Sequence, residues 1–97
     1  MPSLVFATFH PGCDCEMNLV TDGHVTRVPV NYAARLHLRE IFLRADKHPY
    51  RSCKFRFSTG FDLVELELSF QQRKNIEDVF LSADRYEHQD ILKAPTP

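Results

Sequence analysis

Residues 31–70 read NYAARLHLREIFLRADKHPYRSCKFRFSTGFDLVELELSF and contain a predicted helix followed by a predicted β-hairpin. Asn31 is a suitable N-cap, because its side-chain oxygen can accept a hydrogen bond from an N–H of the first helical turn. The helix is predicted over 32–46. The His48-Pro49 pair then ends it, because the residue before proline disfavours the helical conformation and proline cannot extend the hydrogen-bond ladder.

The predicted hairpin has strands at 52–57 and 62–70, joined by a turn around Thr59-Gly60. The expected register pairs Ser58 with Phe61. That register brings apolar residues together on one face and opposite charges together on the other, through the pairs Phe55–Val64, Cys53–Leu66 and Lys54–Glu65. The agreement of these pairs favours a real hairpin.

The predicted helix is apolar on two sides. At about 100° per residue, one arc forms the stripe expected to face the core, with Ala34, Leu38, Ile41, Phe42 and Ala45. The opposite arc carries aromatic, leucine and arginine side chains, the types enriched at interaction hot spots. The candidate partner-binding residues are therefore Tyr32, Arg35, Leu36, Arg39 and Leu43. The alternative is that the second helix or the C-terminal tail covers this arc.

Strands are also predicted before this region. Residues 4–9 form an almost continuous apolar run, which indicates a strand buried on both faces or at the centre of a sheet. Residues 15–20 and 24–30 flank Asp22-Gly23, a dipeptide suited to a two-residue hairpin turn, with Thr21 opposite His24.

After Phe70 the periodicity predicts a helix to about Ala83, and Ser69 with Gln72 forms a possible capping box. We find no internal repeat by inspection. The predicted fold is α+β, in the order strand, strand, strand, helix, strand, strand, helix. It has an antiparallel sheet of about five strands and two helices mainly on one face. A single domain is expected over 1–93, followed by a disordered tail at 94–97.

The composition is that of an ordinary soluble domain, with 43% hydrophobic and 26% charged residues. No apolar run of about 18 residues and no leader-like start is present, which predicts a cytoplasmic protein without a membrane partner. The cysteine count is odd, and Cys13 and Cys15 are too close for an ordinary structural disulfide. We therefore expect Cys13, Cys15 and Cys53 to be reduced.

The formal charge is only −1, but it is unevenly distributed. Residues 31–57 carry seven basic and two acidic side chains, whereas 58–97 carry four basic and eight acidic ones. One alternative function is therefore nucleic-acid binding through the basic segment 35–56. Against this function, the expected register places Phe55 and Phe57 on the opposite face of the hairpin from the basic side chains of Lys54 and Arg56, so rings and charges do not form one binding surface.

A second alternative is a small zinc protein, because His10, Cys13 and Cys15 place three possible ligands within six residues. Cys-x-Cys is an uncommon half-site, so no metal is assigned. No nucleophile elbow, oxyanion loop or phosphate-cradling glycine loop is recognisable, and no cofactor is expected. The sequence thus predicts a protein that is not an enzyme.

The remaining class is a binding module that inhibits or regulates a partner by occupying its surface. In size and lack of motifs the chain resembles small inhibitors encoded by phages and mobile elements, anti-CRISPR proteins among them. This resemblance implies a protein or protein complex as the partner, for example a nucleic-acid-handling machine whose basic groove meets the acidic C-terminal part. A second copy of the chain, forming a homodimer, is a further candidate partner.

Overall fold

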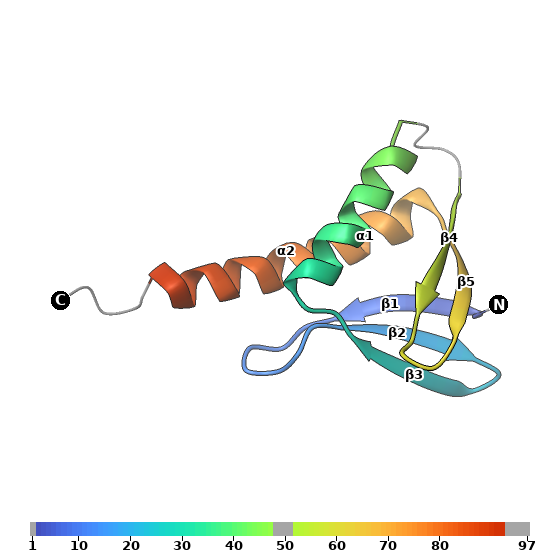
Figure 1. Ribbon diagram of the computed structural model, residues 1–97, viewed down its shortest axis with the longest axis horizontal. Helices are drawn as coiled ribbons and strands as arrows, with labels where there is room; N and C mark the ends of the chain where they lie inside the picture. Colours follow the sequence, from blue (N-terminus) through green and yellow to red (C-terminus); the bar gives the residue numbers. More distant parts are fainter. Residues whose placement is uncertain (1, 48–51, 93–97) are drawn as a thin grey trace.

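The computed structural model describes residues 2–47 and 52–92, with side chains described as far as residue 87. It confirms the α+β class, the five antiparallel strands and the order of elements (Figure 1). These are β1 (Leu4–Thr8), β2 (Glu16–Thr21), β3 (His24–Pro29), α1 (Tyr32–Ala45), β4 (Cys53–Ser58), β5 (Leu63–Leu68) and α2 (Phe70–Leu92). The strands form a three-stranded sheet of order β1-β2-β3 and a two-stranded sheet, β4-β5.

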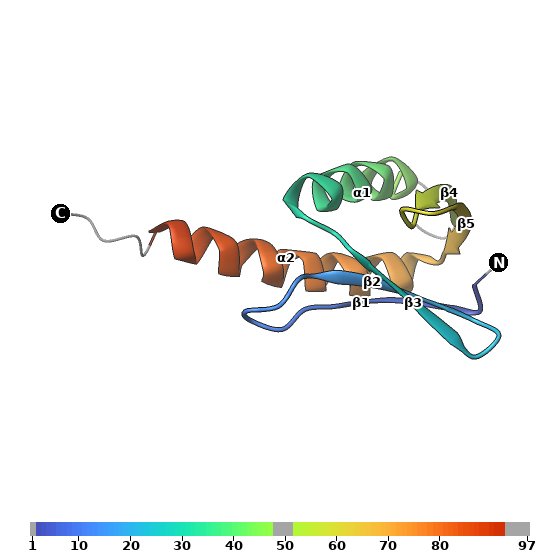
Figure 2. The same ribbon diagram turned by 60° about the horizontal axis from the view of Figure 1, so that its bottom comes forward.

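The molecule is layered. Figure 2 shows α2 above the three-stranded sheet and α1 above α2, with β4 and β5 beside α1 near the start of α2. Buried side chains from both sheets and both helices form one core, in which Met17, Phe42, Leu66 and Phe80 are fully buried. Burying each such side chain contributes about 1.5–3 kcal/mol. Both helices therefore lie on the same side of the larger sheet.

β1 differs from its prediction. It lies at the edge of its sheet because β2 takes the centre and pairs with both β1 and β3. Only one face of β1 is covered: Val5 is buried, whereas Leu4 and Phe6 are exposed. The prediction of a strand buried on both faces was wrong, because a continuous apolar run can also leave one apolar face exposed.

The register of the first hairpin is confirmed, with Thr21 opposite His24 and positive φ angles at Asp22 and Gly23. In the second hairpin the register differs by two residues, because a four-residue turn places Ser58 opposite Leu63. Thr59 N–H donates to the carbonyl of Asp62 across this turn (2.9 Å). A shift of two residues keeps every side chain on its predicted face.

Both helix starts follow their predictions. The Asn31 side chain accepts from Ala34 N–H (2.9 Å), and Ser69 and Gln72 form the reciprocal bonds of a capping box. The cap at the end of α1 is Asp46, and the His48-Pro49 pair lies outside the described residues. α2 runs nine residues beyond its predicted end at Ala83, to Leu92. The predicted disordered tail, 94–97, also lies outside the described residues.

The fold contains an internal repeat, contrary to the sequence analysis. β2-β3-α1 and β4-β5-α2 are each a hairpin followed by a helix, which we call the first and second ββα units. Residues 15–46 align with 53–84 without a gap, at a constant offset of 38 residues. Identical residues at this offset include Cys15/Cys53, Arg35/Arg73, Phe42/Phe80, Ala45/Ala83 and Asp46/Asp84.

The two units contact each other reciprocally. Arg35 of the first unit binds Asp84 of the second (2.9 Å), and Arg73 of the second binds Asp46 of the first (3.3 Å). Arg35 is thus equivalent to Arg73, and Asp46 to Asp84. The arginine of each unit thus contacts the aspartate of the other unit. Such a reciprocal exchange of equivalent contacts is the pattern of a two-fold axis. The ββα units are therefore related by an approximate two-fold axis between α1 and α2.

Candidate functional site

The candidate site is an apolar stripe on the exposed face of α1. Tyr32, Leu36 and Leu43 are 43%, 39% and 65% exposed. Their spacing of four and seven residues keeps them on one face of the helix. Arg39, whose side chain is 35% exposed, borders them. We call Tyr32, Leu36, Arg39 and Leu43 the α1 stripe.

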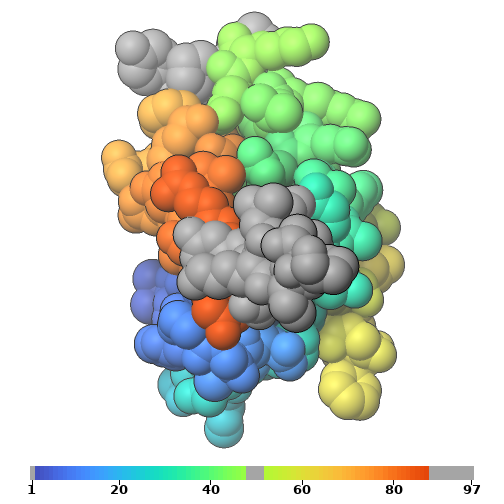
Figure 3. Space-filling model, turned by 90° about the vertical axis from the view of Figure 1, so that its left-hand side faces the viewer, coloured from blue at the N-terminus to red at the C-terminus, as the bar shows by residue number. Residues whose placement is uncertain are grey.

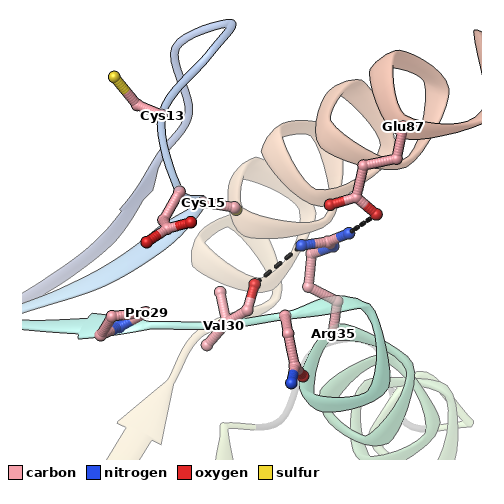
Figure 4. Close-up of a pocket in the computed structure, with 8 residues that line it drawn as sticks. Cys13, Cys15, Pro29, Val30, Arg35 and Glu87 are labelled. Atoms are coloured by element: carbon pink, nitrogen blue, oxygen red, sulfur yellow. Dashed lines mark hydrogen bonds and ion pairs between the residues drawn. The ribbon is translucent and has the colours of Figure 1, made fainter. Parts of the chain in front are cut away.

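Arg35, the fifth predicted partner-binding residue, does not lie on this surface. It is 1% exposed, and its three guanidinium nitrogens are all used inside the protein. Nη1 donates to the carbonyl of Val30 (2.8 Å) and Nη2 to Glu87 Oε2 (2.6 Å) (Figure 4). Nε donates to Asp84 Oδ1 (2.9 Å). Arg35 therefore holds α1 on α2 beneath the stripe, and it is not available as a contact for a partner.

Arg39 joins this group by donating to Asp84 Oδ2 (3.3 Å), and we call Arg35, Arg39, Asp84 and Glu87 the Arg35 cluster. Burial alone would lower the pKa of Arg35, but its hydrogen bonds to Glu87 and Asp84 outweigh burial and raise the pKa. The guanidinium stays charged at any ordinary pH. The cluster thus fixes the orientation of the helix that presents the stripe.

The second unit has a matching group, the Arg73 cluster of Arg73, Asp46 and Lys74. Arg73 is fully buried, and its Nη1 donates to the carbonyl of Leu68 (2.9 Å), as Arg35 does to Val30. Lys74 Nζ binds Asp46 Oδ2 (2.8 Å) and lies 5.2 Å from the centre of the Phe70 ring. A charged side chain therefore stands in α2 where α1 has Leu36, whereas Phe70 and Leu81 keep apolar side chains at the positions of Tyr32 and Leu43, so only the middle of the stripe differs between the two helices.

The predicted zinc ligands do not form a site. Among the residues that the structure describes, no three His, Cys, Asp or Glu side chains are close enough to hold a metal ion. Cys13 is exposed and points away from Arg35, whereas Cys15 is buried and burial raises the pKa of its thiol (Figure 4). All three cysteines are free thiols.

Figure 4 centres on a hollow lined by Cys13, Cys15, Val30, Arg35 and Glu87. The guanidinium of Arg35 already donates to Val30 and Glu87, so the positive charge in this hollow is compensated within the protein. We interpret it as the exposed end of the Arg35 cluster.

The basic segment 35–56 is divided by the fold. Arg35 is buried and Arg39 binds Asp84, while Lys54 lies opposite Glu67 and Arg56 opposite Glu65 across the second hairpin. Residues 48–51 lie outside the described part of the chain. Four of the described basic side chains of this segment therefore have an acidic residue bound to them or opposite them.

The acidic C-terminal part is divided in the same way. Asp84 and Glu87 bind Arg35, and Glu77 binds Lys74 (3.2 Å). Glu65 and Glu67 lie opposite Arg56 and Lys54. The carboxylates of Glu77, Asp84 and Glu87 are therefore engaged inside the protein.

The sequence could not have distinguished Arg35 from Arg39, because both border the same arc of one helix. The distinguishing signal is the repeat, since Arg73 stands at the equivalent position in a helix of different surface character. Neither helix of the described chain combines the length and the apolar character needed to cross a membrane. Comparisons with models of protein families, with curated proteins and with solved structures found no match to this chain.

Proposed function

We propose that this protein is a small non-enzymatic binding module that inhibits or regulates a partner protein by covering part of its surface with the α1 stripe. The observation that carries the proposal is the exposure of Tyr32, Leu36 and Leu43 along one face of a helix. An inhibitor of the kind encoded by phages and mobile elements, including anti-CRISPR proteins, is one form of such a module.

The stripe has the features of an anchor for another protein. An aromatic ring and two leucines supply apolar area, and Arg39 supplies a bordering charge. A stable interface buries about 800 Å² on each partner, which is more than three side chains provide. The stripe would therefore be the centre of a larger contact surface. Because the Arg35 cluster orders α1 beforehand, binding would cost little conformational entropy.

The proposal is tested with Leu43→Glu and a matched control on the same helix, His37→Glu. Both positions are exposed and both changes introduce a carboxylate, but His37 lies on the face of α1 away from the stripe. The wild-type protein and both variants are used as baits in untreated and nuclease-treated lysate of the native host, and captured proteins are identified by mass spectrometry.

We expect one protein to be captured by the wild type and by His37→Glu, and to be lost with Leu43→Glu. Equal thermal unfolding of the two variants would show that both are folded. Retention of the partner by Leu43→Glu would move the interface away from the stripe. Loss of all enrichment on nuclease treatment would instead favour nucleic-acid binding.

A further inference from the structure

A hollowed surface follows the outer edge of β1, away from the α1 stripe. Two neighbouring hollows lie there, one lined by residues 4–7 with Gln72, Asn75, Ile76 and Val79, and one by residues 7–10 with Val79 and Ser82. They share Ala7 and Val79, so together they form one groove. We call it the β1–α2 groove.

The lining shows that the groove follows the edge of the strand. Successive residues of a strand point to opposite faces of the sheet, so a hollow over one face touches only alternate residues. This groove instead touches every residue from Leu4 to His10. On the other side, Asn75, Val79 and Ser82 recur at helical spacing along α2. In Figure 3 the side chains of α2 (orange) lie above the N-terminal strand (dark blue) on the left of the molecule.

β1 is an edge strand that lacks three of the usual protections. Within the described residues it pairs only with β2, so alternate N–H and C=O groups of β1 point outward into the groove. Proteins normally protect such an edge with a charged residue, a proline or a bulge. Leu4–Thr8, with the sequence LVFAT, contains no charged residue and no proline, and its pairing with β2 is continuous. The edge is therefore suited to accept another strand.

The side chains that line the groove also indicate which kind of strand could pair with β1. Apart from His10 at one end, its lining has no ionisable side chain, so a charged segment would lose its hydration without gaining a partner. The floor is apolar and built of small or branched side chains, among them Val5, Ala7 and Val79. The amide of Asn75 and the hydroxyl of Ser82 lie at the exposed rim. An uncharged segment with β-branched side chains at alternate positions matches this surface.

A second copy of the protein fits less well. Pairing β1 with the β1 of another molecule across a two-fold axis would bring both α2 helices to the same face of the joined sheet. α2 already packs against β1 and walls the groove on that face. An extended segment without an attached helix avoids this conflict. We propose that the β1–α2 groove binds an extended, uncharged segment of a partner protein, which pairs with β1 as a fourth strand.

The test uses Asn75→Arg, with Gln71→Arg as its matched control. Gln71 Nε2 donates to Asn75 Oδ1 (2.9 Å), so each variant loses the same hydrogen bond and gains the same charge. Only Asn75 lines the groove. Both residues are exposed on α2, so both variants should unfold at the same temperature as each other. A phage-displayed library of random octapeptides is selected on the wild-type protein.

The best peptide is then synthesised, labelled and titrated by fluorescence anisotropy. We expect an uncharged, β-branched consensus that binds the wild type and Gln71→Arg equally and binds Asn75→Arg at least about tenfold more weakly. Two further peptides are N-methylated at alternate residues, one in each phase. Only one phase should lose binding, because only alternate N–H groups of an added strand face β1.

Four results would overturn the proposal. They are the absence of any enriched peptide, a charged consensus, equal binding to Asn75→Arg and wild type, and equal binding of both N-methylated peptides. Analytical ultracentrifugation of the wild-type protein measures its oligomeric state and so tests whether a second copy of the protein occupies the groove. A dimer that Asn75→Arg dissociates would show that a second copy fills the groove, and this too would contradict the proposal. Leu43→Glu should leave peptide binding unchanged, which separates this surface from the α1 stripe.

Discussion

The two ββα units share their interior and differ on their surface. Arg35, Phe42 and Asp46 recur as Arg73, Phe80 and Asp84, and all of these residues lie in the contact between the units or in the common core. The first unit alone carries an added strand, β1, and an apolar stripe that no charged residue interrupts. The second unit has Lys74 in place of Leu36 and a longer helix. Buried features that both units share maintain the fold, and exposed features that differ between the units are candidates for function.

The largest expected effect tests the shared interior. Phe42 and Phe80 are equivalent and both fully buried. Phe42→Ala and Phe80→Ala should each lower the free energy of unfolding by about 3–5 kcal/mol, because each leaves a cavity in the same core. Urea unfolding followed by circular dichroism measures both. A loss confined to one variant would show that the equivalence does not extend to packing.

The two arginine clusters should differ in strength. Arg35→Met leaves Asp84, whose side chain is 9% exposed, with only the longer bond to Arg39. We expect a loss of about 3–5 kcal/mol, as for other broken buried ion pairs. Arg73→Met leaves Asp46 with its shorter bond to Lys74, so we expect a smaller loss of about 1–3 kcal/mol. Urea unfolding at pH 7 compares the two, and equal losses would contradict this ranking.

The Arg73 cluster should also make stability depend on acid pH. Burial alone would raise the pKa of Asp46, but hydrogen bonds from Lys74 and Arg73 outweigh it and lower the pKa. Since the pKa is lower in the folded than in the unfolded chain, ionised Asp46 stabilises the protein at neutral pH. This contribution is lost as the pH falls below about 4.

Asp46→Asn removes the titrating group. It should be less stable than the wild type at neutral pH and should lose less of its remaining stability between about pH 4 and pH 2. Unfolding in urea across this range measures the slope. Parallel slopes for the two proteins would exclude Asp46 as the source of the acid sensitivity.

The smallest expected effect concerns the thiols. Cys15 and Cys53 are equivalent and buried, and burial raises the pKa of both, whereas Cys13 is exposed. A thiol reagent at pH 8 should therefore modify Cys13 first, and the other two only when the protein opens locally. The fast phase of the reaction with the thiol reagent, which we assign to Cys13, should be absent in Cys13→Ser. A fast phase that survives would place one of the buried thiols within reach of solvent.

Local features of the fold could be predicted from the sequence. The Asn31 and Ser69 caps, the Asp22-Gly23 turn and the core face of α1 depend on residues close together in the chain. The register of the second hairpin was missed because Thr59-Gly60 fits turns of more than one length. The position of β1 was missed because an apolar run does not say how many neighbours a strand has.

Of the candidate site, four of five residues are accessible and one is not. Arg35 was misplaced because its burial depends on Asp84, which lies 49 residues away in the sequence. The repeat was missed because most equivalent positions have changed residue, while the buried arginine and aspartate remained. A comparison of the sequence with itself at the offset of 38 residues would have marked Arg35 and Asp46 as repeated, together with the exposed Leu43.

The reciprocal arginine contacts divide the chain into two halves that bind each other. Each ββα unit supplies one arginine and one carboxylate to the other, as two subunits of a homodimer would. The polypeptide is in this sense a dimer whose halves are joined by the segment after Lys47. Two fragments separated at that segment would retain every described contact between the units, and mixing them should reconstitute the native protein by complementation.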